Sequence, residues 1–366
     1  MTTTLPKRLT RSRFFALAEA LTTPHHLDRY LELVNPMATV TDLRAEIVDV
    51  AHSTADTVTM TLRPTWQWTG FEAGQFVQVG VVIDGVRQTR CYSPASSEHR
   101  SDGLFELTVK AQADGLVSQH LRRNARKGLV VSLVPASGSF RLPEARPDKV
   151  LLISGGSGIT PVLSMLRTLV DEKFAGDITF LHYAYSESDV PYLDELRRIS
   201  ADNENVNLLL AYTDQDAGGD LYGFFGAEHL AAAAPWHRDG QTFLCGPPGL
   251  MRSVRELFRD NGIDDQLHTE EFVTTVEPAD GDASGTVSFS ASGVTADNTG
   301  ASLLDQAEAA GLTPEYGCRM GICFSCTSIK TSGCTKNLRT GELHSDPDQP
   351  IQLCISAAVG DVDIQI

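Results

Sequence analysis

The stretch YGCRMGICFSC, residues 316–326, holds three of the seven cysteines of a 366-residue chain. Cys318, Cys323 and Cys326 have the spacing C-x4-C-x2-C, and Cys354 follows 28 residues later. Four thiolates at this spacing are typical ligands of a two-iron, two-sulfur (2Fe-2S) cluster. The sequence therefore predicts an iron-sulfur site near the carboxyl end.

The residues around these cysteines suit such a cluster. Thiolates and bridging sulfides concentrate negative charge, and Gly317 and Gly321 let a loop fold tightly with its N–H groups pointing inward. The alternatives are a zinc knuckle or ordinary buried thiols, but zinc sites usually pair their cysteines as C-x2-C twice. Cys334 fits no ligand position, and we expect a small apolar or surface thiol there.

Secondary-structure signals flank the cysteine loop. Residues 285–294, GTVSFSASGV, alternate like a strand, residues 302–311 indicate a short helix ending at Gly311, and VDIQI closes the chain as a strand. Together with the cysteine spacing, this order resembles the β-grasp (α+β) fold of plant-type ferredoxins. The resemblance implies a 2Fe-2S ferredoxin domain over residues 285–366.

Composition limits the remaining possibilities. A chain of this length exceeds one ordinary core, so two or three domains are expected. The formal charge of -17 argues against a nucleic-acid partner. No run of about 18 apolar residues occurs, and Glu19 interrupts the short apolar run near the amino end, so we expect neither a transmembrane segment nor export. A cytoplasmic location follows, where clustered thiols indicate metal ligands or redox groups.

The middle of the chain has a glycine-rich loop between a strand and a helix. The apolar run KVLLIS precedes GGSGIT, residues 155–160, and helical periodicity follows. We expect Thr160 to be the N-cap and Pro161 the first helical residue. Gly156 and Gly158 would then leave bare amides facing a phosphate, helped by the helix dipole. A tight turn without a ligand is the alternative.

Further apolar runs alternate with helical patterns through residues 146–275, which predicts an α/β doubly wound parallel sheet. A second loop, CGPPG at residues 245–249, also follows a strand, and ligands of such sheets bind at that edge. The two loops together resemble the NAD(P)-binding domain of the ferredoxin-NADP reductase superfamily. The resemblance implies that the first loop cradles pyrophosphate and that Cys245, Gly246 and Pro247 lie beside the nicotinamide.

Residues 38–145 contain several short alternating strands, which indicate a small antiparallel β-barrel. Within them, Arg90, Tyr92 and Ser93 match the R-x-Y-[ST] motif of the same superfamily. Arginine suits a phosphate, tyrosine offers a flat face to a flavin ring, and a serine hydroxyl can bond the reactive ring nitrogen. A plain strand with alternating exposure is the alternative.

The same resemblance implies further contacts. Val109 and Lys110 would form a second flavin contact, and Gly115 to Ser118, preceding a predicted helix, would hold a pyrophosphate, which favours FAD over FMN. Glu270 and Phe272, in HTEEF, would approach the flavin edge. Glu270 would assist proton handling, although a solvated carboxylate is its ordinary state. The implied catalytic residues are Ser93, Cys245 and Glu270.

Two segments lie outside these domains. Residues 1–37 predict a helical N-terminal extension, which either packs on the barrel or contacts a membrane or partner through its basic residues. Residues 276–284 are rich in Asp, Gly and Ala and predict a linker. From Glu277 onward twelve Asp and Glu face four Lys and Arg, which suggests steering toward a basic acceptor.

The predicted order of domains indicates an electron-transfer function. NADH or NADPH delivers two electrons together, whereas a 2Fe-2S cluster accepts one, so a flavin must stand between them. The resemblance implies an NAD(P)H-dependent reductase that serves a separate oxygenase, hydroxylase or fatty-acyl desaturase. A redox-sensing regulatory protein and a reductase of diffusible substrates are the alternatives. Tyr185, followed by Glu187 and Asp189, favours NADH over NADPH without excluding the latter.

Overall fold

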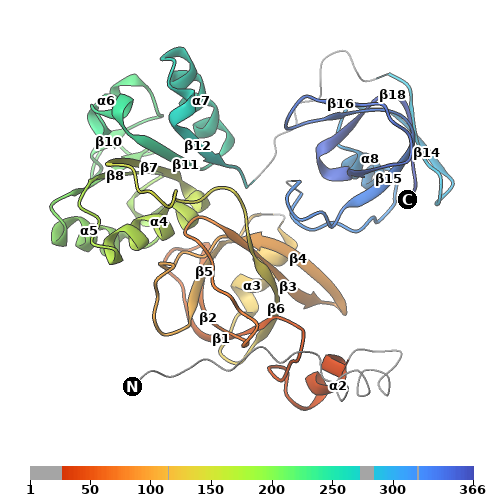
Figure 1. Cartoon of the computed structure of the whole chain (residues 1–366), viewed down its shortest axis with the longest axis horizontal. Coiled ribbons are helices and arrows are strands. Elements are labelled where there is room, and N and C mark those ends of the chain that lie inside the picture. Colours follow the sequence, from red (N-terminus) through yellow and green to blue (C-terminus); the bar gives the residue numbers. More distant parts are fainter. Residues whose placement is uncertain (1–26, 114, 273–283, 320) are drawn as a thin grey trace.

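The computed structural model describes residues 27–113, 115–272, 284–319 and 321–366. Three six-stranded sheets form three bodies along the chain (Figure 1). The predicted linker, apart from Ser284, and the first 26 residues of the predicted extension lie outside the described residues. Within the described residues, no helix has the length and apolar character needed to span a bilayer.

The first body is an antiparallel sheet in the order β4-β3-β6-β1-β2-β5, as predicted. Its strands are β1 (Arg44–Ala51), β2 (Thr57–Pro64), β3 (Phe76–Ile83), β4 (Val86–Tyr92), β5 (Phe105–Lys110) and β6 (Val130–Ser137). A bridge between Pro94 and Leu107 joins the end of β4 to β5 and closes the barrel. Alternation places Val77, Val79 and Val81 inside, and helix α3 (Leu116–Asn124) packs its Val117 and Leu121 against them.

Helix α2 (Leu27–Val34) lies beside this barrel (Figure 1). The buried Asp28 carboxylate accepts hydrogen bonds from the amides of Val40, Thr41 and Asp42, at 2.6 to 2.8 Å. These bonds fix α2 to the segment that enters β1. The part of the predicted extension that is described therefore contacts the barrel, and the rest of that prediction is untested.

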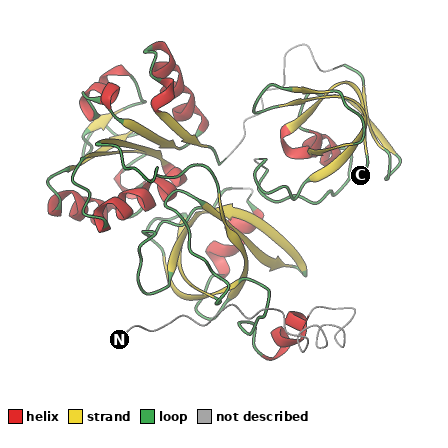
Figure 2. Cartoon of the chain, viewed as in Figure 1, coloured by secondary structure: helices red, strands yellow, loops and turns green. Residues whose placement is uncertain are grey.

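The second body is a parallel sheet in the order β10-β9-β8-β7-β11-β12. Its strands are β7 (Lys149–Gly155), β8 (Asp177–Ala184), β9 (Val206–Tyr212), β10 (Leu221–Tyr222), β11 (Gln241–Cys245) and β12 (Leu267–Glu270). Leu152 packs with helices α4 (Ile159–Asp171) and α5 (Leu193–Asp202), whereas Leu151 and Ile153 pack with α6 (Ala227–Ala233) and α7 (Pro248–Asp260). Because helices cover both faces (Figure 2), its central strands are apolar throughout, which confirms the predicted doubly wound sheet.

The predicted start of α4 is wrong by two residues. A single 3-10 turn over Gly156–Gly158 runs directly into the helix, so Gly158 is the N-cap and Thr160 lies in the first turn. The Thr160 hydroxyl donates to the Ser157 carbonyl at 3.4 Å. Pro161 is accepted here because a first-turn N–H would have no intrahelical partner.

The third body is a mixed sheet in the order β14-β13-β18-β15-β16, with β17 paired to β15. Its strands are β13 (Thr286–Phe289), β14 (Val294–Asp297), β15 (Thr327–Asn337), β16 (Leu343–His344), β17 (Gln349–Gln352) and β18 (Ser356–Ile364). Helix α8 (Leu303–Ala309) packs on the core, and Ser302 caps it by accepting from the Asp305 amide at 3.1 Å. The strand expected over residues 285–294 ends at Phe289, because the chain turns at positions 290–293, with Gly293 at a φ of +66°, and β14 pairs back on β13 as a hairpin.

Candidate functional site

The two glycine-containing loops of the parallel sheet meet at its carboxyl edge. Cys245 at the end of β11 pairs with Ser154 of β7, so the residues that follow each strand lie side by side. A Cβ on Gly158 would stand 2.2 Å from the Cys245 carbonyl oxygen. This oxygen belongs to the backbone of β11 and cannot move away to relieve the clash. Position 158 therefore requires glycine, and the α4 N-terminus is free of a capping side chain where a phosphate would bind.

A small cavity joins this loop to the barrel. Its lining comes from both bodies: Thr57, Thr108, Lys110, Gly156, Ser157, Ile159, Thr160, Asp189 and Pro191. The Lys110 ammonium lies 3.2 Å from an Asp56 carboxylate oxygen and 5.7 Å from the centroid of the Tyr185 ring. The positive charge of Lys110 beside the backbone amides at the start of α4, which no side chain caps, suits the binding of a pyrophosphate group. The sequence reasoning assigned Lys110 to the flavin, whereas the structure also brings it to the nucleotide loop.

The three predicted catalytic residues come together although they are spread over 178 positions. Cys245 ends β11, a strand that the sequence predicted, and pairs with Glu270 of β12, a strand that the sequence did not indicate. The buried Ser93 hydroxyl donates to Glu270 Oε2 over a long 3.5 Å. Burial raises the pKa of Glu270 to about 8, and that of the fully buried Cys245 thiol well above its usual value. This raised pKa favours the neutral acid form of Glu270 at pH 7, although the side chain is only half-buried and lines a cavity.

The predicted flavin-binding motif lies at the end of edge strand β4. Tyr92 packs against the barrel core, and burial raises the pKa of its hydroxyl. Val109 is buried in the same core, so its side chain serves packing. The Arg90 guanidinium carbon lies 5.0 Å above the ring of Tyr316, in the third body.

The start of α3 differs slightly from its prediction. The helix begins at Leu116, so Ser118 lies in its first turn, and Gly115 is the N-cap. The Ser118 hydroxyl accepts from the Gln112 amide and donates to the Gly115 carbonyl, both at 3.1 Å. These bonds shape the loop while the N-cap itself offers no side chain to the first amides. The arrangement fits a pyrophosphate.

The remaining nucleotide-side residues lie close to the same edge. Pro247 is the N-cap of α7, and Gly246 precedes it against Gly155 and Leu250. Phe272 is half-buried and packs on the sheet face that contains Cys245. All predicted nucleotide contacts thus gather on one rim, where the barrel faces the parallel sheet.

The four clustered cysteines converge in the third body. Contacts among their thiols connect them in the order Cys323, Cys318, Cys354, Cys326. The Cys318 amide donates to Cys323 Sγ at 3.1 Å, and the Ile322 amide to Cys318 Sγ at 3.4 Å. Amides pointing at the sulfurs are the donors that a cluster of thiolates needs.

The arrangement of these sulfurs fits two irons better than one zinc. A tetrahedral Zn site with Zn–S bonds of about 2.3 Å brings all its sulfurs within roughly 4 Å of one another. In the part of the chain that the structure describes, the contacts among these sulfurs form a row rather than one compact group. A Cβ on Gly317 would lie 2.8 Å from Cys323 Sγ, so the loop needs glycine there.

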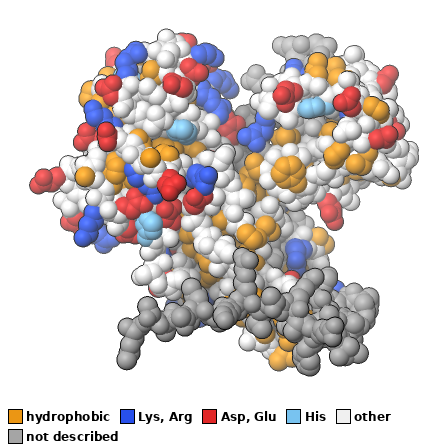
Figure 3. All heavy atoms as spheres, viewed as in Figure 1, with side chains coloured by type: hydrophobic (Ala, Val, Ile, Leu, Met, Phe, Trp, Pro, Cys, Tyr) orange, Lys and Arg blue, Asp and Glu red, His pale blue; other side chains and the backbone are white. Residues whose placement is uncertain are grey.

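The cysteine loop touches the barrel beside the flavin motif. The Cys91 thiol in β4 contacts the Cys318 thiol, next to the Arg90–Tyr316 stack. A cavity of about 710 Å³ where the three bodies meet is lined by Phe140 of the barrel side, Glu270 of the parallel sheet and Ile322 of the cysteine loop, among others. Figure 3 shows Lys and Arg side chains along the edge of the second body that faces the third. Nicotinamide, flavin and cluster candidates thus share one junction.

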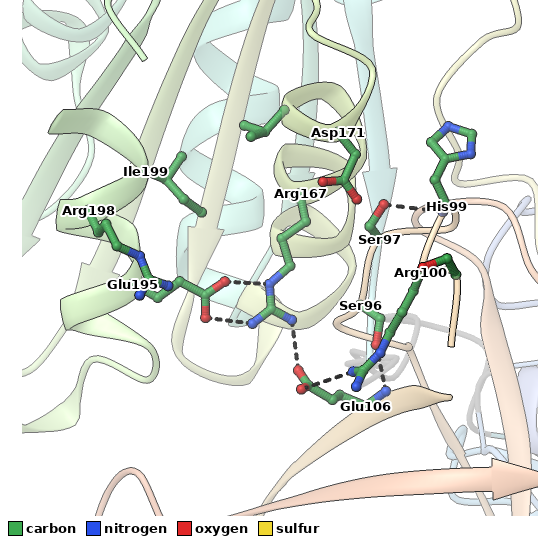
Figure 4. A pocket seen from close by; sticks show the side chains of 12 residues that line it. Ser96, Ser97, His99, Arg100, Glu106, Arg167, Asp171, Glu195, Arg198 and Ile199 are labelled. Carbon is green, nitrogen blue, oxygen red and sulfur yellow. Dashed lines mark hydrogen bonds and ion pairs between the residues drawn. The ribbon is translucent and has the colours of Figure 1, made fainter. Parts of the chain in front are cut away.

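An ion-pair network fixes the barrel to the parallel sheet (Figure 4). Arg167 of α4 donates to Glu195 of α5 at 2.7 and 2.8 Å, and to Glu106 of β5 at 2.9 Å. It also donates to the Ala95 carbonyl at 2.7 Å and lies 4.8 Å over the Tyr192 ring. The sequence offered no signal for this residue, because its partners are far apart in the chain.

A second cluster at this boundary has the composition of a cation site. Ligand atoms of Glu98, His99 and Glu172 lie within 4.8 Å of one another. The Arg146 guanidinium already occupies the position, 3.3 Å from Glu98 Oε1 and 2.6 Å from Glu172 Oε1. Its positive charge satisfies both carboxylates, so the cluster is an ion-pair network.

Comparison with known proteins agrees with this geometry. Residues 45–142 match the oxidoreductase FAD-binding domain, and residues 152–256 match the oxidoreductase NAD-binding domain. An NADPH oxidoreductase of Mycobacterium tuberculosis is 36% identical, covering 96% of this chain and 91% of that protein. A glycine betaine monooxygenase reductase subunit of Pseudomonas aeruginosa is 30% identical, covering 80% and 87%.

A solved structure shares the fold over most of the chain. Phthalate dioxygenase reductase, described as a modular structure for electron transfer from pyridine nucleotides to a 2Fe-2S centre, aligns with a TM-score of 0.61. The alignment has 23% identity and covers 89% of this chain and 98% of that one. Extensive identity to reductases, two matched domains and the observed sheets lead to one conclusion. The chain belongs to the ferredoxin reductase family of FAD- and NAD-binding oxidoreductases.

Proposed function

We propose that this protein carries electrons from NADH or NADPH through FAD to a 2Fe-2S cluster, and from there to a separate oxygenase, hydroxylase or fatty-acyl desaturase. The observation that carries the proposal is the junction of three bodies, where Cys318 contacts the flavin-motif strand through Cys91. The third body, with its parallel β13–β18 pair and α8, supports a ferredoxin-like β-grasp domain over residues 285–366.

Each set of residues has a distinct task in this proposal. Arg90, Tyr92 and Ser93 would hold the flavin, with the start of α3 at its pyrophosphate. Cys318, Cys323, Cys326 and Cys354 would hold the cluster. The flavin supplies exchange between paired and single electrons, and the cluster supplies single-electron delivery.

The protein groups around the flavin position control protons and water. Ser93 is buried and Glu270 is half-buried beside it, and the raised pKa of Glu270 favours a proton on the pair at neutral pH. The buried Cys245 thiol stays neutral and adds packing without charge. Two uncharged groups would therefore face the position proposed for the flavin.

The partner class follows from the relatives. A P. aeruginosa relative is a monooxygenase reductase subunit, and a Mycolicibacterium smegmatis relative, 29% identical, is the ferredoxin reductase component of 3-ketosteroid-9-alpha-monooxygenase. An acceptor of the oxygenase class would receive single electrons from an acidic domain. A redox-sensing regulatory role is the alternative function, and fast turnover with a nicotinamide donor in the absence of a regulatory partner would argue against it.

The choice of nucleotide depends on Arg197. Its guanidinium is paired with the Glu187 carboxylate just beyond β8, where a 2'-phosphate would have to displace the acid. This pair favours NADH, while the M. tuberculosis relative is an NADPH oxidoreductase. Glu187→Gln should raise the ratio of NADPH to NADH kcat/KM, because it frees the arginine. An unchanged ratio would place nucleotide discrimination elsewhere.

The test of the proposed function combines analysis and turnover. Purified protein should contain two irons, two acid-labile sulfides and one FAD, and should reduce cytochrome c with a nicotinamide donor. Cys354→Ser should remove the iron signal and cytochrome c reduction, while reduction of ferricyanide, which the flavin alone can serve, continues. Cys334→Ser, on β15, is the matched control and should retain both. Iron-free wild-type protein would refute the cluster part.

A further inference from the structure

The aromatic ring of Tyr316 connects the third body to the barrel. The ring is half-buried and packs against the core of the third body. The guanidinium of Arg319, in the same body, lies 4.1 Å from the ring centroid, and that of Arg90, on barrel strand β4, lies 5.0 Å from it. A ring fixed in one body thus meets a cation of another, more than 200 positions earlier in the chain.

On the third-body side, Arg319 is held in place by helix α8. Its guanidinium pairs with the Asp305 carboxylate at 3.2 Å and with the Glu308 carboxylate. The backbone of Arg319 has a φ of +57°, a left-handed conformation that residues other than glycine adopt uncommonly. The cost of this conformation is offset by the two carboxylates and the ring that the side chain contacts. The third body therefore fixes the ring that Arg90 meets.

On the barrel side, Arg90 has capacity for a second ligand. Its Nη1 donates to the Thr89 carbonyl at 2.8 Å, and no carboxylate pairs with it in the described ranges of the chain. A guanidinium stacks through its face and donates hydrogen bonds through its edge, so one arginine can serve an aromatic ring and an anionic group together. Arg90 begins the R-x-Y-S motif that the proposed function assigns to FAD, and the FAD phosphates are such an anionic group.

We propose that Tyr316 is a positioning residue that holds the cysteine loop against β4 through Arg90, and that Arg90 thereby links FAD binding to the seating of the third body. The inference rests on the proposed function, since it requires FAD at the motif and a cluster in the loop. A phosphate at the edge of Arg90 restricts that side chain, so less freedom is lost when it stacks on the ring. The link is reciprocal: FAD strengthens the contact with Tyr316, and the contact strengthens FAD binding by the same factor.

The first measurement is the release of FAD from full-length holoprotein, followed as the recovery of flavin fluorescence after dilution. Tyr316→Leu keeps an apolar side chain on the core but removes the ring face, and should release FAD about fivefold faster. Tyr316→Phe keeps the face and should release FAD at the wild-type rate. The control, Tyr222→Leu, removes an exposed tyrosine from β10, at the opposite edge of the parallel sheet from β12, and should change nothing.

The second measurement distinguishes positioning from a general structural role. Each holoprotein, in excess FAD, is mixed with NADH or NADPH, and flavin reduction is followed by absorbance and cluster reduction by rapid-freeze EPR. Tyr316→Leu should reduce its flavin at the wild-type rate. Its cluster should be reduced about tenfold more slowly, because the loop is no longer held at its position on β4. Tyr316→Phe should match the wild type in both rates.

Hydrogen exchange tests the link in the wild type, where no substitution disturbs folding or iron content. Removal of FAD from the full-length protein should speed exchange of the backbone amides at residues 316–319 about fivefold, although these residues belong to another body.

Unchanged exchange would overturn the link, as would FAD release or cluster reduction at the wild-type rate in Tyr316→Leu, and either result would leave the proposed function intact. Slow cluster reduction in Tyr316→Phe would overturn the stacking role of the ring. If Tyr316→Leu loses iron, exchange in the wild type decides. Wild-type protein that contains no FAD or no iron would refute the proposed function itself, so cofactor analysis precedes the other measurements.

Discussion

Glu270→Gln should make the protein more stable at alkaline pH. Burial raises the pKa of Glu270 to about 8 from an ordinary 4.5, and the hydrogen bond from Ser93 only partly opposes this. The folded protein therefore retains a proton that the unfolded chain releases. Glutamine has nearly the same shape, carries no charge at any pH, and can still accept from the Ser93 hydroxyl.

The size and the sign follow from proton linkage. Below pH 4.5 both states hold the proton, so the carboxyl group has no pH-dependent cost. Between pH 4.5 and 8 the free energy of unfolding falls by about 1.4 kcal/mol for each pH unit. Above pH 8 the buried carboxyl group lowers the free energy of unfolding by its full amount, about 5 kcal/mol. Between pH 6 and pH 9 the wild type should lose about 2.5 kcal/mol that Glu270→Gln keeps.

Calorimetry of flavin-free protein measures this difference. For a unit of 150–250 residues, 1 kcal/mol corresponds to about 2–4 °C, so the Tm advantage of Glu270→Gln should widen by about 5–10 °C from pH 6 to pH 9. Glu256→Gln removes an exposed carboxylate from α7, which packs on the same parallel sheet, and is the control for the loss of one negative charge. A Tm difference that stays constant over this range would refute the buried, protonated assignment of Glu270.

Two further substitutions test the loops and the boundary between barrel and sheet. Gly158→Ala should weaken nucleotide binding at least tenfold in a fluorescence titration and cost about 1–3 kcal/mol of stability, because its Cβ would strike the Cys245 carbonyl; Gly249→Ala, whose Cβ meets nothing within 4 Å, should do neither. Arg167→Met should lower the free energy of unfolding by about 3–5 kcal/mol in urea, because the partly buried Glu195 loses its partner and Glu106 keeps only Arg100. Arg197→Met removes an exposed pair and should cost less than about 1 kcal/mol; equal losses for the two arginines would contradict the account of Arg167.

Local patterns in the sequence were sufficient to predict which kind of secondary structure and sheet each part of the chain forms. Alternation at Val77, Val79 and Val81 indicated an antiparallel barrel strand, and uninterrupted apolar runs indicated strands covered on both faces. These signals are short-range, because a side chain's face depends only on its position in its own strand. Motif spacing likewise placed the glycine loops and the four cysteines.

Predictions near turns were less accurate, because the signals in the sequence are short-range. A 3-10 turn shifted the first residue of α4 from the expected Pro161 to Ile159, and the strand expected over residues 285–294 is interrupted by a turn between β13 and β14. β15 was not predicted, because its polar residues alternate only weakly and its single buried lysine, Lys330, is satisfied by three carbonyls. Such positions are decided by hydrogen bonds to distant backbone, which periodicity does not report.

By itself the sequence determined the kinds of domain, their order, and the residues that could carry nucleotide, flavin and iron. The tertiary structure decided which of these residues touch: Ser93 with Glu270, Cys91 with Cys318, and Arg167 with carboxylates from two bodies. Each of these pairs is separated by 28 to more than 200 positions. Contacts across that distance depend on how whole sheets pack, and burial at one of them raises the pKa of Glu270, which its residue type alone does not predict.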